Sequence, residues 1–471
     1  TVKEQVREQG SVLAQEQDSI GGGFQATQAF QGEMDEVRLY RRALSAAEVR
    51  ALAEYRESAV SEPVAIVGDE RIENVPGGWM PGWGFRRSFT LDSGRVDEAL
   101  ADFPVLVRLT SDNFDFGAAR ADGFDVRFTL ADGTVLDYER ERHDAAGQKA
   151  EYWVRLPEVS STADTTFYLT YGNPLASNGE QAAGVWDRHV RARYGMGDAG
   201  SAQINDSTTN ANHAAKRAVD RPQAAEGLAG WAQEFNGISD YLEAPHAASL
   251  NLSTAITVSA WVYKPGSWES AYQKIVGKCR TDGGEYAYGL SQASVPYGTF
   301  FFQTISGTLR SVAATSHPTA DAWHQLVGTY DGAAMNYYVD GALAASVNYS
   351  GTLTGNTHPL RVGHAYNEEY FRGGIDEVRI SDVARNPAWI QADYHGGAGS
   401  LLAAGPVEVL QVRHFISGVV KDVATGEGVA GVSLLSREGA VLATSDFNGH
   451  YAFEFEAGWS GSLIPVYGNG R

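Results

Sequence analysis

The chain has very little cysteine, with a single residue, Cys279, among 471. One thiol allows no disulfide within the chain and no thiolate cluster for zinc or an iron–sulfur centre, so a bound metal would need oxygen ligands. Positive charge is also scarce: 37 Lys and Arg stand against 58 Asp and Glu, which gives a net charge of −21. A surface this acidic repels a phosphate backbone and argues against nucleic acid as a partner.

Long apolar segments are missing too. No run approaches the ~18–20 residues needed to cross a bilayer, so we predict no membrane span in this chain. Glycine is plentiful instead, with 53 residues against 15 prolines, and 43% of the chain is apolar. Such a chain can bury several cores. Its richness in turn formers and β formers predicts an all-β protein of β-sandwiches in series, with short helices.

An internal repeat organises the chain. Residues 30–39 (FQGEMDEVRL) recur 341 positions later as residues 371–380 (FRGGIDEVRI). A helix signal follows each copy, because Ser45 begins a capping box and Asn386 precedes a proline at a first helical turn. Only 29 residues precede the first copy, too few for a sandwich. Residues 1–57 are therefore expected to be the C-terminal part of an incomplete domain.

Turn and linker signals divide the rest of the chain. Asp-Gly pairs between alternating apolar runs predict hairpins, because type I′ turns need positive φ at both central residues. Polar stretches that contain proline predict linkers. The predicted order after residue 57 is a linker at 58–78, a sandwich at 79–187, a larger sandwich at 188–402, a linker at 403–414 and a truncated sandwich at 415–471.

Five sequence blocks in the larger sandwich resemble the laminin G-like, concanavalin A-like jelly roll found in large secreted bacterial proteins. The blocks are residues 235–242, 256–263, 323–332, 338–341 and 374–380. The resemblance implies a complete jelly roll at 188–402 and, through the repeat, that residues 1–57 end a second one. It also implies an extracellular or cell-surface location.

Two further resemblances cover the remaining sandwiches. Residues 79–187 are similar to a bacterial domain family of unknown function, through motifs such as Trp83–Arg87 and Tyr152–Pro157. Residues 415–471 resemble the carboxypeptidase regulatory-like, transthyretin-type sandwich, through motifs that include Ser417–Asp422. The second resemblance implies a stalk or spacer, whose last strands are expected to be missing here.

Concanavalin-like jelly rolls include glucanases, so a catalytic carboxylate pair is the first chemistry to test. Retaining glycosidases need two carboxyl groups about 5–5.5 Å apart, which on one strand means two acids that share a face. The acidic strand holds Asp376 and Glu377 as neighbours, predicted to point to opposite faces, and position 380 is Ile. We therefore predict that the chain is not an enzyme.

Asp240 and Asp376 are candidate ligands for a structural calcium ion. Carboxylates and backbone carbonyls are the ligands that Ca²⁺ prefers, and jelly rolls of the resembled kind often hold such an ion. The alternative interpretation is structural: Asp240 ends a turn, and Asp376 pairs with Arg379 or another basic neighbour.

Aromatic side chains in loop-like stretches are candidates for carbohydrate binding, because the face of such a ring can stack on a sugar ring. The alternative is that these rings only anchor loops. The candidates are Trp268, Tyr272, Tyr297, Tyr366 and Tyr370.

These patterns and resemblances together predict a non-catalytic structural or adhesive segment of a large bacterial surface protein. Its expected partners are glycans, other surface proteins or copies of itself. Incomplete sandwiches expose strand edges that can pair with another chain, so one hypothesis is a fibre of chains joined head to tail. The alternative is the carbohydrate-binding part of an extracellular enzyme that degrades polysaccharides.

Overall fold

The structure is a computed structural model of the chain. It describes residues 64–73, 79–80, 82–197, 200–217, 222–268, 272–280, 285–293, 298–365, 369–409, 413–422, 425–436, 439–455 and 463–467. The chain divides into a terminal unit, Thr1–Pro76 with Leu410–Arg471, and a central unit, Gly77–Val409. The domain end predicted at residues 1–57 lies outside the described residues.

The terminal unit contains a small β-sandwich whose strands come from before and after the central unit in the chain. β1 (Val64–Glu73) pairs antiparallel with β25 (Arg413–Asp422) along its whole length. β28 (His450–Phe455) pairs with the opposite edge of β25. The second sheet has the order β27 (Val441–Thr444), β26 (Val432–Leu435) and β29 (Ile464–Tyr467).

β1 corrects two predictions. Residues 58–78 contain a strand where the sequence predicts a linker, and the sandwich predicted as truncated at 415–471 is extended by that strand. The sequence does not predict this pairing, for two reasons. Charged residues interrupt the apolar pattern of β1, and the whole central unit separates β1 from its partner strand in the chain. Val420, Leu434 and Tyr451 are buried in the core of this sandwich.

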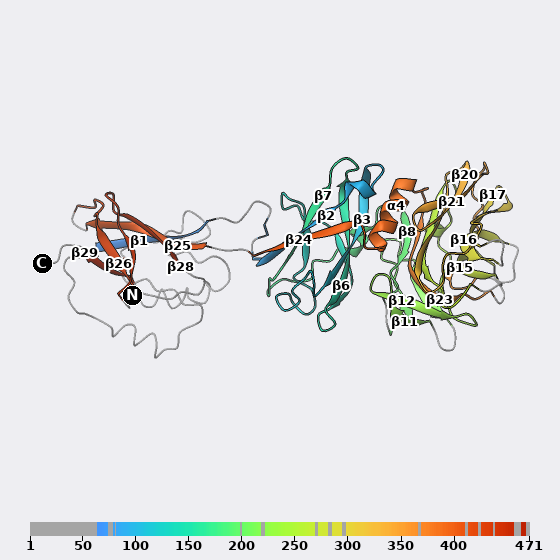
Figure 1. The fold of residues 1–471 in the computed structure, drawn as a ribbon, viewed down its shortest axis with the longest axis horizontal. Coiled ribbons are helices and arrows are strands. Elements are labelled where there is room, and N and C mark those ends of the chain that lie inside the picture. The colour runs from blue at the N-terminus through green and yellow to red at the C-terminus, as the bar shows by residue number, and fades with distance from the viewer. Residues whose placement is uncertain are drawn as a thin grey trace. The chain divides into compact units, whose positions relative to one another are not determined.

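The first sandwich of the central unit takes its edge strand from the far end of that unit. Gly405 and Pro406 make the region 403–414 look like a linker, but an edge strand tolerates proline because one side of it makes no ladder hydrogen bonds. Figure 1 shows this strand, β24, in orange beside β2. The two sheets are β24 (Leu402–Val409), β2 (Phe85–Leu91), β7 (Thr165–Tyr171) and β4 (Arg127–Thr129), and β3 (Leu100–Thr110), β6 (Lys149–Val159) and β5 (Tyr138–Asp144).

Aromatic rings fill the space between these two sheets. Phe128 and Tyr138 are fully buried there, and each such ring stabilises the fold by roughly 1.5–3 kcal/mol. The helix α4 (Pro387–Gly397) contributes Ala388 and Ala392 to the same core. The helix that follows the jelly roll therefore also fixes the neighbouring sandwich.

The jelly roll is formed by two large antiparallel sheets, which we call the β15 sheet and the β23 sheet. The β15 sheet has the order β18 (Thr308–Ala313), β17 (Thr299–Ile305), β16 (Tyr286–Gln292), β15 (Gln273–Cys279), β22 (Leu360–Val362), β13 (Tyr241–Ala244), β10 (Ala214–Arg217) and β9 (Gln203–Ile204). The β23 sheet has the order β11 (Gln223–Glu226), β12 (Trp231–Asn236), β23 (Arg372–Ser381), β14 (Ile256–Tyr263), β19 (Trp323–Tyr330), β20 (Ala334–Val339) and β21 (Ala342–Asn348), with β8 (Val190–Tyr194) also paired to β23.

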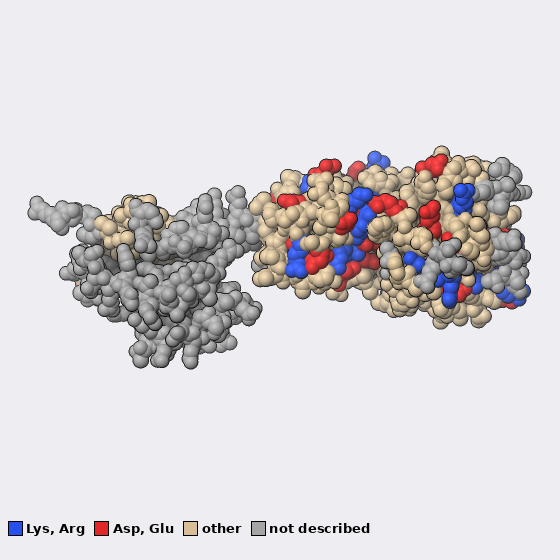
Figure 2. Space-filling model, turned by 90° about the horizontal axis from the view of Figure 1, so that it is seen from below, with Lys and Arg blue, Asp and Glu red and all other residues tan. Residues whose placement is uncertain are grey.

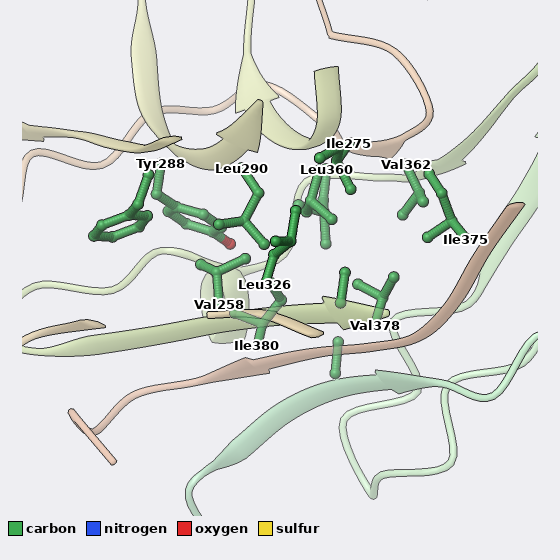
Figure 3. Close-up of a cluster of buried hydrophobic side chains, with 14 of the residues drawn as sticks. Val258, Ile275, Tyr288, Leu290, Leu326, Leu360, Val362, Ile375, Val378 and Ile380 are labelled. Carbon is green, nitrogen blue, oxygen red and sulfur yellow. The ribbon is translucent and has the colours of Figure 1, made fainter. Parts of the chain in front are cut away.

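Branched side chains from the two sheets meet in one core, which Figure 3 shows in close-up. Ile275 and Leu290 of the β15 sheet lie on one side, and Leu326, Val378 and Ile380 of the β23 sheet lie on the other. All five side chains are fully buried. Because alternate residues of a strand point to opposite faces, the residues between them lie on the outer faces of the sheets.

One of the predicted Asp-Gly turns and the second of the two helix signals lie where they were predicted. The turn between β20 and β21 has positive φ at both Asp340 and Gly341, 53° and 77°, as type I′ geometry requires. Asn386 caps α4 by accepting a hydrogen bond from the backbone N–H of Trp389 at 2.8 Å, and Pro387 lies in the first turn. The prediction of an all-β protein made of several antiparallel sheets is confirmed.

Candidate functional site

The outer face of the β15 sheet carries a cation surrounded by aromatic rings. The ammonium of Lys274 lies 5.3 Å from the ring centroid of Phe302 and 5.8 Å from those of Tyr272 and Phe300. The same ammonium lies 2.8 Å from the carboxylate of Glu369. A cation this close to ring faces is attracted by their quadrupoles, which holds the rings in fixed orientations.

A loop that follows β22 crosses over this face. Gly363 turns the chain back with φ of +81°, and Tyr370 then forms a parallel bridge with Lys274. The ring of Tyr370 stacks on that of His364, with centroids 4.1 Å apart, and His364 lies 5.2 Å from the ring of Tyr241. The loop therefore adds a second group of rings beside the first.

Another aromatic pair lies in and beside the loop that follows β14. Trp268 stacks on His317, with centroids 5.1 Å apart and planes 5° apart. The buried ammonium of Lys264 lies 6.0 Å from the Trp268 ring and donates a hydrogen bond to Oε1 of Gln273 at 2.7 Å. Gln273 lies between Tyr272 and Lys274 in the strand, so its side chain points to the opposite face, and Trp268 packs against the core of the jelly roll.

The structure thus brings together two of the five aromatic residues proposed from the sequence, Tyr272 and Tyr370. We call the surface formed by Tyr272, Lys274, Phe300 and Tyr370 the aromatic end. Tyr272 is 48% exposed there, Phe300 and Tyr370 are half-buried, and Lys274 is buried. Tyr297 and Tyr366 lie outside the described residues.

Sequence reasoning missed the strand residues Lys274, Phe300 and Phe302. A signal for the two phenylalanines was present, because the run Phe300-Phe301-Phe302 has to place rings on both faces of a strand. Cys279 of the same sheet is fully buried, its thiol donates to the carbonyl of Ala365 at 3.3 Å, and burial raises its pKa to about 11. This thiol is therefore protonated at neutral pH and unsuited to nucleophilic chemistry.

The two candidate calcium ligands do not lie together. Asp240 accepts a hydrogen bond from the backbone N–H of Asn236 at 3.2 Å, and Asn236 lies opposite Arg372 in the ladder. Asp376 is four residues further along that strand, which places it ~13 Å away. Within the described residues no group of three or more His, Cys, Asp or Glu side chains is placed to hold a metal ion. Calcium binding stays a prediction.

A β-bulge corrects the predicted orientation of the two neighbouring acids on β23. Ile375 and Val378 both point into the core, so Asp376 and Glu377 between them both face away from it. Glu377 has φ of +50°, the local distortion that an inserted residue produces. The prediction of opposite faces assumed a strict period of two, and the bulge breaks that period.

Asp376 and Glu377 then have different structural roles. The carboxylate of Asp376 accepts backbone N–H groups from Leu228 at 2.9 Å and Ala229 at 3.1 Å, which fixes the loop before β12. Glu377 pairs with Arg379 at 2.9 Å, so the ion pair expected for Asp376 belongs to its neighbour. Asp376 therefore has a structural role, as the alternative interpretation predicts, but its partners are backbone N–H groups and not Arg379.

Glu377 lies at a charged contact between the jelly roll and the first sandwich. Arg193 on β8 is 1% exposed and pairs with Glu377, with Glu139 at 2.8 Å and with Glu141 at 2.7 Å. Arg379 also pairs with Asp393 of α4 at 2.7 Å. We call the group Glu139, Glu141, Arg193, Asp376, Glu377, Arg379 and Asp393 the acidic seam.

Two indole N–H groups complete the acidic seam. Trp186 donates to Glu139 at 2.7 Å, and Trp153 donates to Glu377 at 3.1 Å. The seam is closed to solvent, because none of its side chains is more than a tenth exposed. On the surface, by contrast, Figure 2 shows positive and negative side chains of the central unit lying side by side.

A small cleft of about 30 Å³ lies beside the acidic seam, between α4 and the β23 sheet. Its two arginines are already paired, Arg379 with Asp393 and Arg385 with Asp187 at 2.7 Å. Arg385 also lies 4.0 Å from the ring of Trp389. The open rings of the aromatic end are therefore the better candidate for a ligand.

Comparisons with known proteins bear on the two sandwiches of the central unit. Residues 236–391 match the family model of the concanavalin A-like lectin/glucanases superfamily, so the jelly roll is a domain of that type. Residues 122–194 match the model of a domain of unknown function, DUF2341. Both resemblances inferred from the sequence are confirmed for these regions. The carboxypeptidase regulatory-like resemblance of residues 415–471 stays a prediction.

The first part of the chain has a different relative. Residues 2–64 match the pentaxin family model, a likeness that the repeat did not predict. Over 62 residues the chain is 45% identical to neuronal pentraxin-1 of Rattus norvegicus and of Homo sapiens. The match covers 13% of this chain and 14% of those relatives, so the chain spans about a seventh of their length.

Solved structures similar to the chain include domain 4 of AbnA, a GH43 extracellular arabinanase from Geobacillus stearothermophilus, in complex with arabinotriose. It is 22% identical, and the match covers 44% of this chain and 98% of that one at a TM-score of 0.35. The binding domain of Paraclostridial Mosquitocidal Protein 1 is 14% identical over 59% of this chain and 68% of that one, with a TM-score of 0.37. Likenesses this weak assign no ligand. Among the described residues, no helix has the length and apolar character to span a membrane.

Proposed function

We propose that this chain is a non-catalytic adhesive segment of an extracellular or cell-surface protein, and that its jelly roll binds carbohydrate at the aromatic end. The arrangement around Lys274 carries the proposal: three rings lie within 6 Å of its ammonium, and one of them, Tyr272, is half exposed. Ring faces suit the apolar faces of sugars, and a few charged groups can fix the hydroxyls. The match to a lectin and glucanase superfamily supports the same choice.

The positions of the acids support a non-catalytic role. A glycosidase needs two carboxyl groups that reach a bound glycosidic linkage. Asp376 and Glu377 are at most 1% exposed, and they hold backbone N–H groups and arginines. Their carboxylates would have to leave these partners to reach a substrate.

The second candidate is the carbohydrate-binding part of a polysaccharide-degrading enzyme. It uses the same aromatic end and differs only in what the rest of the protein does. An assay for release of reducing sugar by the protein as it occurs naturally, on each polysaccharide that the chain binds, separates the two. We expect binding without hydrolysis; hydrolysis by the natural protein would favour the second candidate, and hydrolysis by this chain itself would overturn the non-catalytic proposal.

A glycan array followed by titration calorimetry tests carbohydrate binding. The full chain is probed with chelator and with added Ca²⁺, which also tests the calcium prediction. We expect Tyr272→Ala and Lys274→Met each to weaken binding at least tenfold. Tyr168→Ala is the matched control, because Tyr168 also stacks under a cation, Arg86 at 4.5 Å, but lies on the other sandwich. If the chain binds no glycan under either condition, or if Tyr168→Ala weakens binding equally, the proposal is wrong.

A further inference from the structure

The helix α4 connects the jelly roll to the first sandwich through two faces. Ile390 packs on Val327 and Tyr338 of the β23 sheet. Ala388 and Ala392 are buried in the core of the first sandwich, where their small side chains let the helix backbone come close. β24 follows α4 and pairs with β2 at the edge of the same sandwich. The joint therefore consists of the helix and the strand that follow the jelly roll.

The internal repeat continues through this helix. Four further positions correspond at the same offset of 341: Ser45 with Asn386, Ala47 with Ala388, Val49 with Ile390, and Ala51 with Ala392. The cap, the two alanines that enter the sandwich and the branched residue that packs on the jelly roll are thus all repeated. Residues 45–56 lie outside the described residues, and their sequence predicts a helix with the two faces of α4.

A strand follows at a similar distance in both copies. β24 begins at Leu402, 22 positions after Ile380, and β1 begins at Val64, 25 positions after Leu39. Each of the two strands lies at the edge of its sheet and pairs antiparallel with a neighbour, β24 with β2 and β1 with β25. β1 is therefore the counterpart of β24, and residues 45–56 have the position of α4 in the chain.

The terminal sandwich has an open side beside β1. In the first sandwich α4 packs on β3, the edge strand of the second sheet, where Trp389 lies 5.0 Å from the ring of Phe103. In the terminal sandwich β27 lies against β28, so the opposite edge strand, β29, lies on the side of β1. Pro465 of β29 pairs with the buried Leu434 and faces the space between the sheets, yet it is exposed. Phe103, which α4 covers, is only 1% exposed.

We propose that residues 45–56 form a helix that docks on the terminal sandwich between β1 and β29, as α4 docks on the first sandwich. Ala47 and Ala51 face Leu463 and Pro465, and Val49 faces the segment that precedes the helix. Only residues 57–63 separate this helix from β1, so docking is intramolecular and is favoured over binding of a second copy. The open side of the terminal sandwich is thus a surface for the end of a jelly roll.

Hydrogen exchange of the full chain tests the docked helix. Ala47→Glu places a charge on the face that meets the sandwich, so we expect exchange at residues 463–467 to be at least tenfold faster than in the wild type. Ala46→Glu is the matched control, because Ala46 corresponds to Pro387, which is exposed on α4. We expect this control to exchange like the wild type. Unchanged exchange in both variants, or equal acceleration in both, overturns the proposal.

Cross-linking gives a second readout without a charge substitution. The full chain with Ala51→Cys and Pro465→Cys is expected to be joined within the chain by a short bismaleimide, as peptide mapping would show. Ala51→Cys with Val441→Cys is the control, because Val441 is 60% exposed on β27, at the other edge of the same sheet. Cys279 does not compete, because it is fully buried. A first pair that is not linked, or equal linkage of the two pairs, contradicts docking beside β29.

Discussion

Cations lie beside aromatic rings on both sides of the jelly roll, but the two arrangements have different roles. At the acidic seam, Arg193 lies 4.9 Å from the ring of Trp186, and the neighbouring sandwich covers both. At the aromatic end, Lys274 lies among three rings and no described element covers Tyr272. Figure 1 shows β15 and β16 on the side of the jelly roll away from β3 and β6. The covered pairs join two domains, whereas the exposed ring of Tyr272 beside the buried Lys274 is available to a ligand.

The largest effect on the free energy of unfolding is expected from a substitution in the acidic seam. Arg193→Leu leaves Glu139, Glu141 and Glu377 without their shared counter-charge, and breaking a buried pair in this way costs about 3–5 kcal/mol. Urea unfolding of the full chain measures the loss. A cost below about 1 kcal/mol would mean that water reaches the seam, and the contrast between the two sides would then disappear.

A smaller effect is expected in the loop that crosses the aromatic end. Gly363→Ala forces a side chain onto φ of +81° and places a Cβ 2.3 Å from the ring of Phe235, so we expect a loss of about 1–3 kcal/mol together with weaker carbohydrate binding. Gly307→Ala is the control, because Gly307 has a similar φ of +78° and no neighbouring atom within 4 Å. Equal effects of the two substitutions on binding would show that the loop does not position the site.

Removing a ring from the open side is expected to affect binding more than stability. Tyr370→Ala deletes the partner of His364 in a half-buried stack, which contributes about 0.5–1.5 kcal/mol beyond its buried area. Calorimetry should show an affinity loss of about tenfold, equivalent to about 1.4 kcal/mol. Unchanged affinity with a lower unfolding midpoint would mean that Tyr370 only anchors its loop, the alternative that the sequence left open.

The smallest effect is expected from an exposed ion pair. Lys149 lies 3.0 Å from Glu226, and both side chains are at least half exposed. Lys149→Ala should change the free energy of unfolding by less than about 0.5 kcal/mol, because water and salt screen such pairs. A loss comparable with that of Arg193→Leu would show that burial does not distinguish the seam from the surface.

Local signals in the sequence were sufficient for much of the fold. The Asp-Gly turn at Asp340 and the cap at Asn386 depend on the conformations of single residues, so the sequence predicts them correctly. Pairings across long separations leave no such signal. β1 and β24 were predicted as linkers because neither shows which distant strand it will join.

The candidate site was predictable in part for the same reason. Tyr272 and Tyr370 stand out as rings in loop-like stretches, whereas Lys274 is an ordinary strand residue until its neighbours are known. The bulge at Glu377 was hidden because a run of strand residues gives no sign of an inserted position. The acidic seam depends on the orientation that this bulge gives Glu377, so the sequence did not predict the seam.

Hydrogen exchange with and without a bound glycan tests the central claim most directly. The full chain, saturated with the tightest ligand from the array, is compared with the free chain. The account predicts slower exchange at residues 272–279 and 369–372, which include Tyr272, Lys274 and Tyr370 of the aromatic end, and no change at residues 190–194, which include Arg193 of the seam. Protection at the seam or at the cleft beside α4, with none at residues 272–279, would contradict it.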